Sequence, residues 1–233
     1  MILVKDLKKS FNKDGQEIEV IKGFNLEIAR GESLAMLGVS GAGKSTFIHI
    51  LGTLDHPTSG TVLFDGVNVF DWPETKIAEF RNKKIGFVFQ FHHLLPEFNA
   101  LENTMMPGLI SGMQREEASD RAGTLLEEVG LGHRMKHKPG ELSGGEQQRV
   151  AVARAVVKNP EILYADEPTG NLDFENSAQI ATLLTELNKE GLTIVMVTHN
   201  LEMAQQEAHR TIRMQYGHVV EGAPSTVAGE KRP

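Results

Sequence analysis

Apolar and polar positions along the chain fall into blocks that predict a sheet of mostly parallel strands. Four short, mostly apolar runs, at residues 32–37, 84–89, 161–166 and 193–198, are separated by longer stretches of helical periodicity. Strands that alternate with helices are typical of a parallel sheet, and runs this apolar indicate strands covered on both faces. The pattern therefore predicts an α/β fold.

Two regions depart from this pattern. Residues 61–70, TVLFDGVNVF, contain two β-like runs joined by Asp65 and Gly66, a hairpin signal that predicts an antiparallel piece beside the parallel core. Between residues 100 and 140 the period is helical, with one apolar stripe and an opposite charged face that we interpret as solvated surface. The stripe consists of Ala118, Ala122, Leu125, Leu126 and Val129, and the charged face of Arg115, Glu116, Asp120, Glu127 and Glu128.

Composition narrows the class of protein. A chain of 233 residues is long enough for one α/β domain, and its formal net charge of −7 disfavours a nucleic-acid partner. Without cysteine there is no disulfide framework and no cysteine-ligated zinc. The opening MILVKDLKKSF lacks the apolar core of a signal peptide, and no run approaches the roughly 18 apolar residues that span a bilayer. We expect a protein that is soluble in its own right.

The strongest chemical signal is GVSGAGKST at residues 38–46, which follows the run SLAML and precedes the helical run FIHILGTL. Glycines in such a loop let consecutive backbone N–H groups turn toward an anion, while Lys44 reaches the β- and γ-phosphates and Ser45 can ligate Mg²⁺. A glycine-rich turn that carries a lysine by chance does not explain this placement. The loop predicts nucleotide binding through Gly38, Ser40, Gly41, Ala42, Gly43, Lys44, Ser45 and Thr46.

A pair of carboxylates follows the third apolar run. Asp166 ends that run, at the edge of an open α/β sheet where ligands bind, and an aspartate there can hold Mg²⁺. Glu167 comes next and can orient and polarise the attacking water as a general base. The alternative is an acidic pair at the start of a helix, stabilised by the helix dipole.

Two more polar residues end strand candidates. His199 closes the run TIVMVT, where it could hydrogen-bond the γ-phosphate and sense hydrolysis, although a lone histidine at a strand end is usually structural. Gln90 ends the run KIGFVF, and an amide there can touch the metal or the water. We therefore add Gln90 and His199 to Lys44 and Glu167 as catalytic candidates, and Gln90 to Ser45 and Asp166 as metal ligands.

The stretch ELSGGEQQRVAVARAV at residues 141–156 poses a question about its own ligand. Two glycines follow a serine and open an expected helix, which is the build of an anion site. No lysine stands where a phosphate would favour one. The residues alone do not say whose phosphate this turn would bind.

These motifs, GVSGAGKST, Gln90, LSGGE, LYADEP, NLD and VTH, stand in the order found in the nucleotide-binding domains of ABC transporters, and the resemblance covers almost the whole chain. It implies a RecA-like core with an antiparallel β subdomain and a helical subdomain. The chain would then be one ATP-binding domain over residues 1–233, with the helical subdomain at about 91–160 and a polar tail at about 222–233. The ligands implied are ATP and Mg²⁺.

The same resemblance implies a homodimer that shares its nucleotides. Ser143, Gly144 and Gly145 would face the ATP held by a second subunit, because a helix N-terminus with glycine N–H groups favours a γ-phosphate without a lysine. Asp173 resembles the loop residue that links the two sites. Phe11 resembles the aromatic residue that stacks on adenine, and its alternative is a strand phenylalanine packed in the core.

One loop narrows the resemblance further. FQFHHLLPEFNALEN at residues 89–103 is similar to the ATPases of lipoprotein-releasing transporters, and MacB-type and FtsE-type ATPases have similar loops. The implied partners are two transmembrane permease subunits like LolC and LolE, at the cytoplasmic face of a bacterial inner membrane. Phe91, Leu94 and Leu95 would lie where the permease docks. We reject His92 and His93 as metal ligands, because neighbouring residues point to different faces of a regular element.

Two other classes of function share part of this pattern. A soluble ABC ATPase of DNA repair or translation would have the same motifs, usually with long coiled coils, zinc cysteines or a second ATPase domain. A small-molecule kinase could use the loop at residues 38–46, but it would not explain LSGGE. The motif set favours a transporter ATPase over both.

Overall fold

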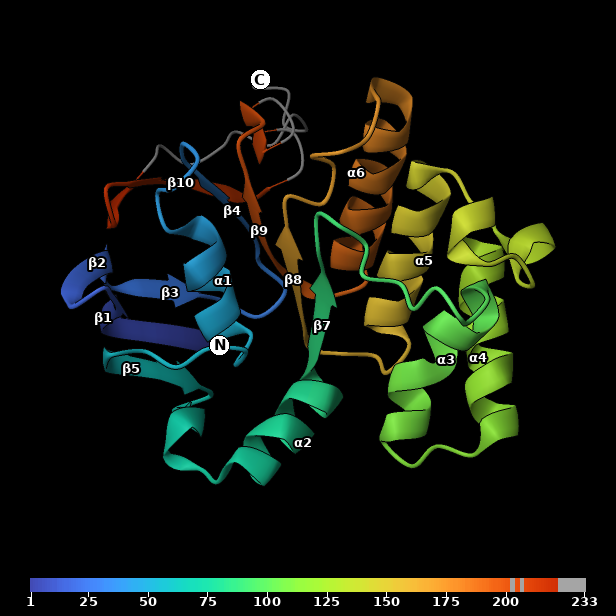
Figure 1. Cartoon of the computed structure of the whole chain (residues 1–233), viewed down its shortest axis with the longest axis horizontal. Helices are drawn as coiled ribbons and strands as arrows, with labels where there is room; N and C mark the ends of the chain where they lie inside the picture. The colour runs from blue at the N-terminus through green and yellow to red at the C-terminus, as the bar shows by residue number, and fades with distance from the viewer. Residues whose placement is uncertain (202–203, 206–207, 222–233) are drawn as a thin grey trace, which may run out of the picture.

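The computed structural model describes residues 1–201, 204–205 and 208–221, and it has two sheets with helices packed around them (Figure 1). The polar tail expected at residues 222–233 lies outside the described residues. Within the described ranges, no helix is both long and apolar enough to cross a membrane.

The central sheet is parallel except at one edge. Its strand order is β11-β10-β4-β9-β8-β7, and only β11 runs antiparallel to its neighbour β10. The strands are β4 (Ser33–Leu37), β7 (Ile85–Val88), β8 (Ile162–Asp166), β9 (Thr193–Thr198), β10 (Arg210–Gln215) and β11 (His218–Glu221). All four predicted apolar runs form strands, and β4 and β9 are buried along their whole length. The predicted α/β fold is confirmed.

A second, antiparallel sheet has the order β2-β1-β5-β6, with β3 also paired to β1. Its strands are β1 (Ile2–Lys13), β2 (Gln16–Lys22), β3 (Leu26–Ile28), β5 (Ser59–Phe64) and β6 (Val67–Asn68). The hairpin predicted at Asp65 and Gly66 is present. Its second strand is shorter than predicted, because the Asn68 side chain accepts a hydrogen bond from the Phe70 N–H and starts the 3-10 turn η1 (Val69–Asp71).

The helices cover the central sheet on both faces. They are α1 (Lys44–Leu51), α2 (Glu74–Lys84), α3 (Ala100–Ile110), α4 (Arg115–Glu128), α5 (Gly144–Val156) and α6 (Phe174–Lys189), with 3-10 turns η2 (Gly132–Arg134) and η3 (Pro139–Glu141). In Figure 1, α1 lies on one side of β8, and α5 and α6 lie on the other, with α3 and α4 beyond α5. We call α3, α4, η2 and η3 the helical lobe.

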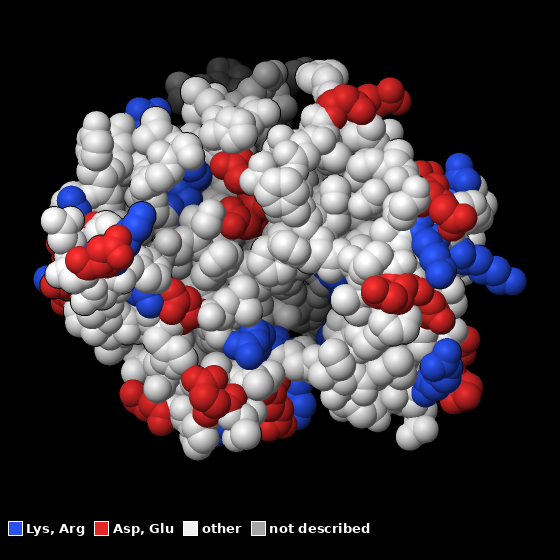
Figure 2. Space-filling view, in the orientation of Figure 1, with Lys and Arg blue, Asp and Glu red and all other residues white. Residues whose placement is uncertain are grey.

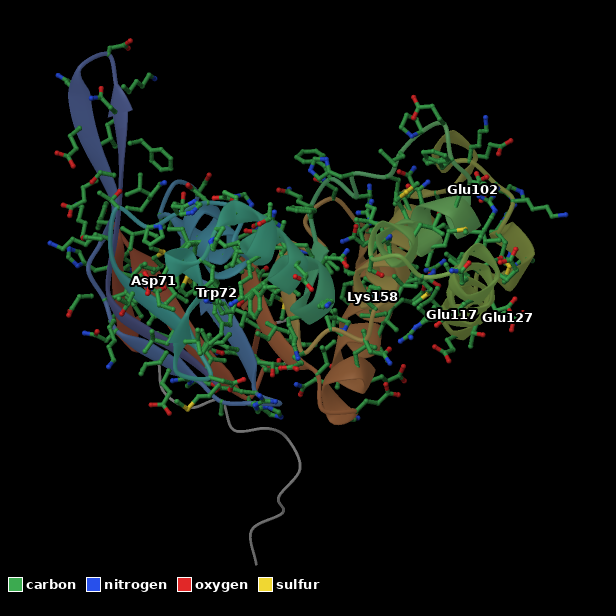
Figure 3. All side chains as sticks on the ribbon, turned by 90° about the horizontal axis from the view of Figure 1, so that it is seen from below. Asp71, Trp72, Glu102, Glu117, Glu127 and Lys158 are labelled. Carbon is green, nitrogen blue, oxygen red and sulfur yellow. The ribbon has the colours of Figure 1, made fainter. Side chains whose placement is uncertain are left out.

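Helix α5 is part of two hydrophobic cores. Val152 and Val156 pack with residues of β4, β8, β9 and α6, whereas Val150 and Ala153 pack with residues of the helical lobe. The predicted stripe of α4 is largely confirmed, since Ala118, Ala122 and Leu126 are fully buried. The charged face is at the surface, and Figure 3 shows the labelled Glu117 and Glu127 on the outside of the helical lobe. Helix α5 therefore packs against both the helical lobe and the central sheet.

Candidate functional site

The loop at residues 38–46 connects β4 to α1, as the sequence predicts. Gly41 and Gly43 have φ angles of 78° and 101°, which glycine adopts without strain. A Cβ at Gly38 would lie 2.5 Å from the carbonyl oxygen of Met214, so this position has no room for a side chain. Lys44 is 7% exposed, and its Nζ donates to the Gly38 carbonyl oxygen at 2.8 Å. The loop thus holds a cation at the N-terminus of α1, an arrangement that suits a phosphate chain.

Oxygen atoms gather beside this loop. Ser45 is exposed and its Oγ donates to Asp166 Oδ1 at 3.1 Å. Burial raises the pKa of Asp166 above its ordinary value, and the hydrogen bond from Ser45 opposes that shift. Hydroxyl and carboxylate oxygens are ligands that Mg²⁺ prefers, and a cation would offset the burial of Asp166. The donor set therefore fits a magnesium ion.

Glu167 has a backbone conformation that few residues adopt. Its φ angle is 47°, a left-handed value that costs about 1–3 kcal/mol in a residue other than glycine. Its Oε2 accepts a hydrogen bond from the His199 backbone N–H at 3.2 Å and contacts His199 Nδ1 at 2.8 Å, while Oε1 lies 3.8 Å from Lys44 Nζ. A turn follows Glu167, and α6 begins only at Phe174, so the alternative of a helix-start acidic pair is wrong.

Gln90 follows β7, next to β8, and reaches the loop after Glu167. Its Nε2 donates to Asn171 Oδ1 at 3.3 Å, and Asn171 Nδ2 donates back to the Gln90 carbonyl oxygen at 3.1 Å. A Cβ at Gly170 would lie 3.0 Å from Gln90 Nε2, so this glycine makes room for the amide. Sequence reasoning did not single out Asn171, although it lies inside the NLD motif.

The turn LSGGE opens α5 as expected, but it lies apart from the loop at residues 38–46. Ser143 and Gly144 are exposed, and the helix that begins there, α5, lies on the side of β8 opposite to α1 (Figure 1). Ser143 Oγ accepts from the Glu146 N–H at 3.2 Å, and Glu146 Oε2 accepts from the Ser143 N–H at 2.8 Å. This capping box stabilises the helix start, and the hydrogen bond from the Ser143 backbone lowers the pKa of Glu146. Because Ser143 and Gly144 are exposed, a ligand outside the chain's own loop has access to this helix start.

The loop residue Asp173 caps α6 and, through Asn176, is connected to Gly145 of LSGGE. Asp173 accepts from the Asn176 N–H at 2.9 Å and from Asn176 Nδ2 at 2.7 Å, and the first of these bonds lowers the pKa of Asp173. Asn176 in turn fills the space beside Gly145, where a Cβ would lie 1.9 Å from Asn176 Oδ1. Gly145 is therefore required by packing against α6.

Phe11 lies on β1 and is 43% exposed. Lys9 Nζ lies 4.7 Å from the centre of its ring. The alternative of a phenylalanine packed in the core is therefore wrong, and part of the side chain has access to solvent. Whether this ring stacks on a nucleotide base stays a prediction.

The segment at residues 91–95 shows which apolar side chains are accessible. Phe91 and Leu95 are 67% and 41% exposed. Leu94 instead packs against the core of the helical lobe, beside Ala100 and Leu126. The sequence analysis treated all three residues as equivalent, because the apolar pattern does not show that the Leu94 side chain packs into the helical lobe.

Sequence reasoning also missed two polar residues of α5. Gln148 is 1% exposed, and its Nε2 donates to the Pro168 carbonyl oxygen at 2.7 Å. Arg154 donates to the carbonyl oxygens of His92 and His93. Neither belongs to one of the six motifs, and a glutamine or arginine in a helix is ordinarily interpreted as surface.

The sequence model of the family described as ABC transporter matches residues 21–170. Together with the site geometry, this match shows that the chain belongs to the ABC transporter family, as an ATP-hydrolysing nucleotide-binding subunit. A protein of Syntrophus aciditrophicus, the lipoprotein-releasing system ATP-binding protein LolD, is 65% identical over 221 residues, which cover 94% of this chain and 99% of that protein. LolD of Geobacter metallireducens is 55% identical over 94% of this chain and 98% of its own length.

Solved structures agree with this family. A dimeric structure of MJ0796, described as a bacterial ABC transporter cassette, has a TM-score of 0.88 and 40% identity, over 95% of this chain and 98% of that chain. A second dimeric MJ0796 structure, of a post-hydrolysis state bound to ADP and Pi, has a TM-score of 0.87 and 38% identity over the same shares. Both are dimers of ATP-binding cassettes.

Proposed function

We propose that this chain is the ATPase subunit of a transporter that releases lipoproteins from the inner membrane toward the outer membrane. The observation that carries the proposal is its 65% identity, over nearly the whole chain, to a relative named as the ATP-binding protein of a lipoprotein-releasing system. The loop at residues 89–103, singled out from the sequence, supports the same assignment. Two copies would lie at the cytoplasmic face beneath two permease subunits like LolC and LolE.

Within each copy, the loop at residues 38–46 binds the phosphates of ATP. Lys44 neutralises the β- and γ-phosphates, and the backbone N–H groups at the start of α1 complete the cradle. Ser45, Asp166 and Gln90 would hold Mg²⁺, which supplies charge neutralisation on the phosphate oxygens. Phe11, with its accessible face, would stack on the adenine ring.

Glu167 acts as the general base. Its strained backbone and the two contacts from His199 hold the carboxylate in one position, so that it can accept a proton from the attacking water. His199 is the orienting group for that carboxylate and faces the γ-phosphate. Gln90, tied to Asn171, lines the same site and reports its state to the segment at residues 91–95.

The second half of each site comes from the other copy. Ser143 and Gly144 are accessible at the N-terminus of α5, and together with the buried Gly145 they would bind the γ-phosphate held by the partner subunit, with Asp173 at the boundary between the two sites. Each copy therefore hydrolyses ATP slowly alone, and ATP favours the dimer. We propose the same domain limits for these roles, with a helical subdomain at about 91–160.

The free energy that holds the acyl chains of a lipoprotein in the bilayer limits what the ATPase can do by itself. At about 0.8 kcal/mol per CH₂, three acyl chains of roughly fifteen carbons hold on the order of 30 kcal/mol in a bilayer. The permease subunits must therefore offer an apolar cavity that keeps the acyl chains away from water. Closure of the ATPase dimer then only changes the shape of that cavity.

Reconstitution tests the proposed cargo. The chain should co-purify with two permeases from its native membranes, and vesicles that contain the complex should release a triacylated lipoprotein when ATP and Mg²⁺ are added. Lys44→Ala should reduce both ATPase and release by at least about 100-fold, because the phosphates lose their cation. A wild-type complex that hydrolyses ATP and exports a drug or peptide, but releases no lipoprotein, would replace this proposal by a MacB-type function.

We expect charged residues at the exposed positions of the segment at residues 91–95 to uncouple ATP hydrolysis from lipoprotein release. Phe91→Glu and Leu95→Glu should leave ATP binding intact and lower lipoprotein release per ATP by at least about tenfold, because a permease helix would lose its apolar contact. Val67→Glu is the matched control, since Val67 is 45% exposed on the antiparallel sheet. Leu94 is unsuitable, because a charge there would also disrupt the helical lobe. Normal release by both Glu variants would contradict the docking assignment.

A further inference from the structure

Helix α5 is attached along its length to the segment that follows β7. Near its N-terminus, Gln148 Nε2 lies 3.4 Å from the Phe89 carbonyl oxygen as well as 2.7 Å from that of Pro168. Near its C-terminal end, Arg154 Nη1 and Nη2 donate to the carbonyl oxygens of His93 and His92, at 2.6 and 2.7 Å. The same helix carries the accessible N-terminus at Ser143 and Gly144.

Arg154 is a partly buried cation whose hydrogen bonds go to the backbone. Burial lowers its pKa, and no carboxylate of the described residues lies within 4 Å of its guanidinium. Its planar fork binds two successive carbonyl groups, which a lysine ammonium cannot do in the same geometry. His93 has a φ angle of 48°, and its ring packs edge-on against Phe89 at 5.1 Å between centres. A partly buried charge and a left-handed residue both carry a cost, which suggests that the contact has a use.

His92 continues the connection to the other end of α5. Burial lowers the pKa of its imidazole, and a hydrogen bond with the backbone of Gly144 acts in the opposite direction. Its Nε2 is buried without a hydrogen-bond partner. The ring therefore lies against the backbone of the residue that opens α5.

We propose that Arg154 and His92 are positioning residues that tie the segment at residues 91–95 to the N-terminus of α5. When permease contact displaces Phe91 or Leu95, α5 then moves together with the segment, and Ser143 and Gly144 at its N-terminus are displaced too. Helix α5 transmits the displacement without bending because it is packed into two hydrophobic cores. This inference rests on the proposed function only in that Ser143 and Gly144 complete the ATP site of a partner subunit. Neither Arg154 nor His92 is among the residues assigned above to bind ATP or Mg²⁺.

The first test uses dimer formation, which needs no cargo. In a Glu167→Gln background, Arg154→Gln should leave binding of a fluorescent ATP analogue to the monomer within about twofold, because the loop at residues 38–46 is untouched. The ATP-dependent dimer should weaken by at least about tenfold in analytical ultracentrifugation. Arg154→Lys keeps the charge but not the planar fork, so it should recover only part of the lost dimer affinity. Arg149→Gln is the matched control, since Arg149 lies on the same helix and donates to Gln179 of α6 instead.

The second test guards against a variant that simply folds poorly. His92→Phe keeps a ring of similar size, and because the ring makes little use of its Nε2, the melting temperature should stay close to that of the wild type. In the reconstituted complex kcat should fall by about tenfold with KM for ATP unchanged, and His92→Asn, which keeps a polar group near Nδ1, should recover part of it. Unchanged dimer affinity in Arg154→Gln, or an unchanged kcat in His92→Phe, would overturn the inference. Failure of the wild-type complex to release lipoproteins would contradict the proposed function alone, since dimer formation does not depend on cargo.

Discussion

Glu167→Gln is expected to bind ATP, to hydrolyse it about 10²- to 10⁴-fold more slowly than the wild type, and to accumulate as an ATP-bound dimer. The amide keeps the size of the carboxylate, so the contact from the backbone N–H of His199 survives, but it cannot accept the proton of the attacking water. Because ATP is then not consumed, the state that favours the dimer persists. Phosphate release and size-exclusion chromatography with ATP and Mg²⁺ measure the two effects.

A matched control lies at the other end of β8. Glu161 precedes β8 at its opposite end and pairs with Lys84, so Glu161→Gln removes one carboxylate from the same region without touching the site. Its turnover should stay within about twofold of the wild type. Near-normal turnover in Glu167→Gln would remove Glu167 from the role of base, and its strained backbone would then have no catalytic purpose.

Gly145→Ala is expected to abolish most of the ATP-dependent dimerisation while leaving ATP bound to each monomer. The new methyl group would lie 1.9 Å from Asn176 Oδ1 and 2.3 Å from Asn176 Cγ. Asn176 cannot swing away freely, because its side chain donates to Asp173 at 2.7 Å. A misfit of about 2–3 kcal/mol, if it displaces the start of α5, weakens the dimer by about 30- to 150-fold.

The experiment compares dimer dissociation constants in the Glu167→Gln background. Gly140→Ala is the control, because no atom lies within 4 Å of a Cβ at Gly140 and this glycine is just outside LSGGE. Asn176→Ala combined with Gly145→Ala should restore part of the affinity by removing the clashing amide. If Gly145→Ala dimerises as tightly as the Glu167→Gln parent, the packing of α5 against α6 does not set the position of this half-site.

The parallel sheet and its chemistry were readable from the chain because they depend on local pattern. Apolar runs covered on both faces predicted β4, β7, β8 and β9, and their C-terminal residues placed Gln90, Asp166, Glu167 and His199 at one edge. Glycine spacing predicted the loop around Lys44, since only glycine adopts the left-handed angles found at Gly41 and Gly43 without strain. The order of motifs also indicated the family.

Tertiary structure decided which side of a residue faces its neighbours. Adjacent apolar residues look alike in sequence, yet Leu94 packs into the helical lobe while Leu95 is exposed, because the chain after β7 has no regular period that fixes direction. Phe11 could have been core or surface, and only the edge position of the β1–β2 hairpin leaves its ring accessible.

The sequence by itself determined the strands, the phosphate loop and the carboxylates, because each is specified by residues adjacent in the chain. Only the tertiary structure decided that LSGGE lies across the sheet from the chain's own phosphate loop (Figure 1), that Gly145 is fixed by Asn176, and that Arg154 binds residues 92 and 93. The tertiary structure also decided that the face shown in Figure 2 is hollowed between the central sheet and the helical lobe. These relations join residues tens of positions apart, and their geometry follows from how whole helices pack, which no local pattern encodes.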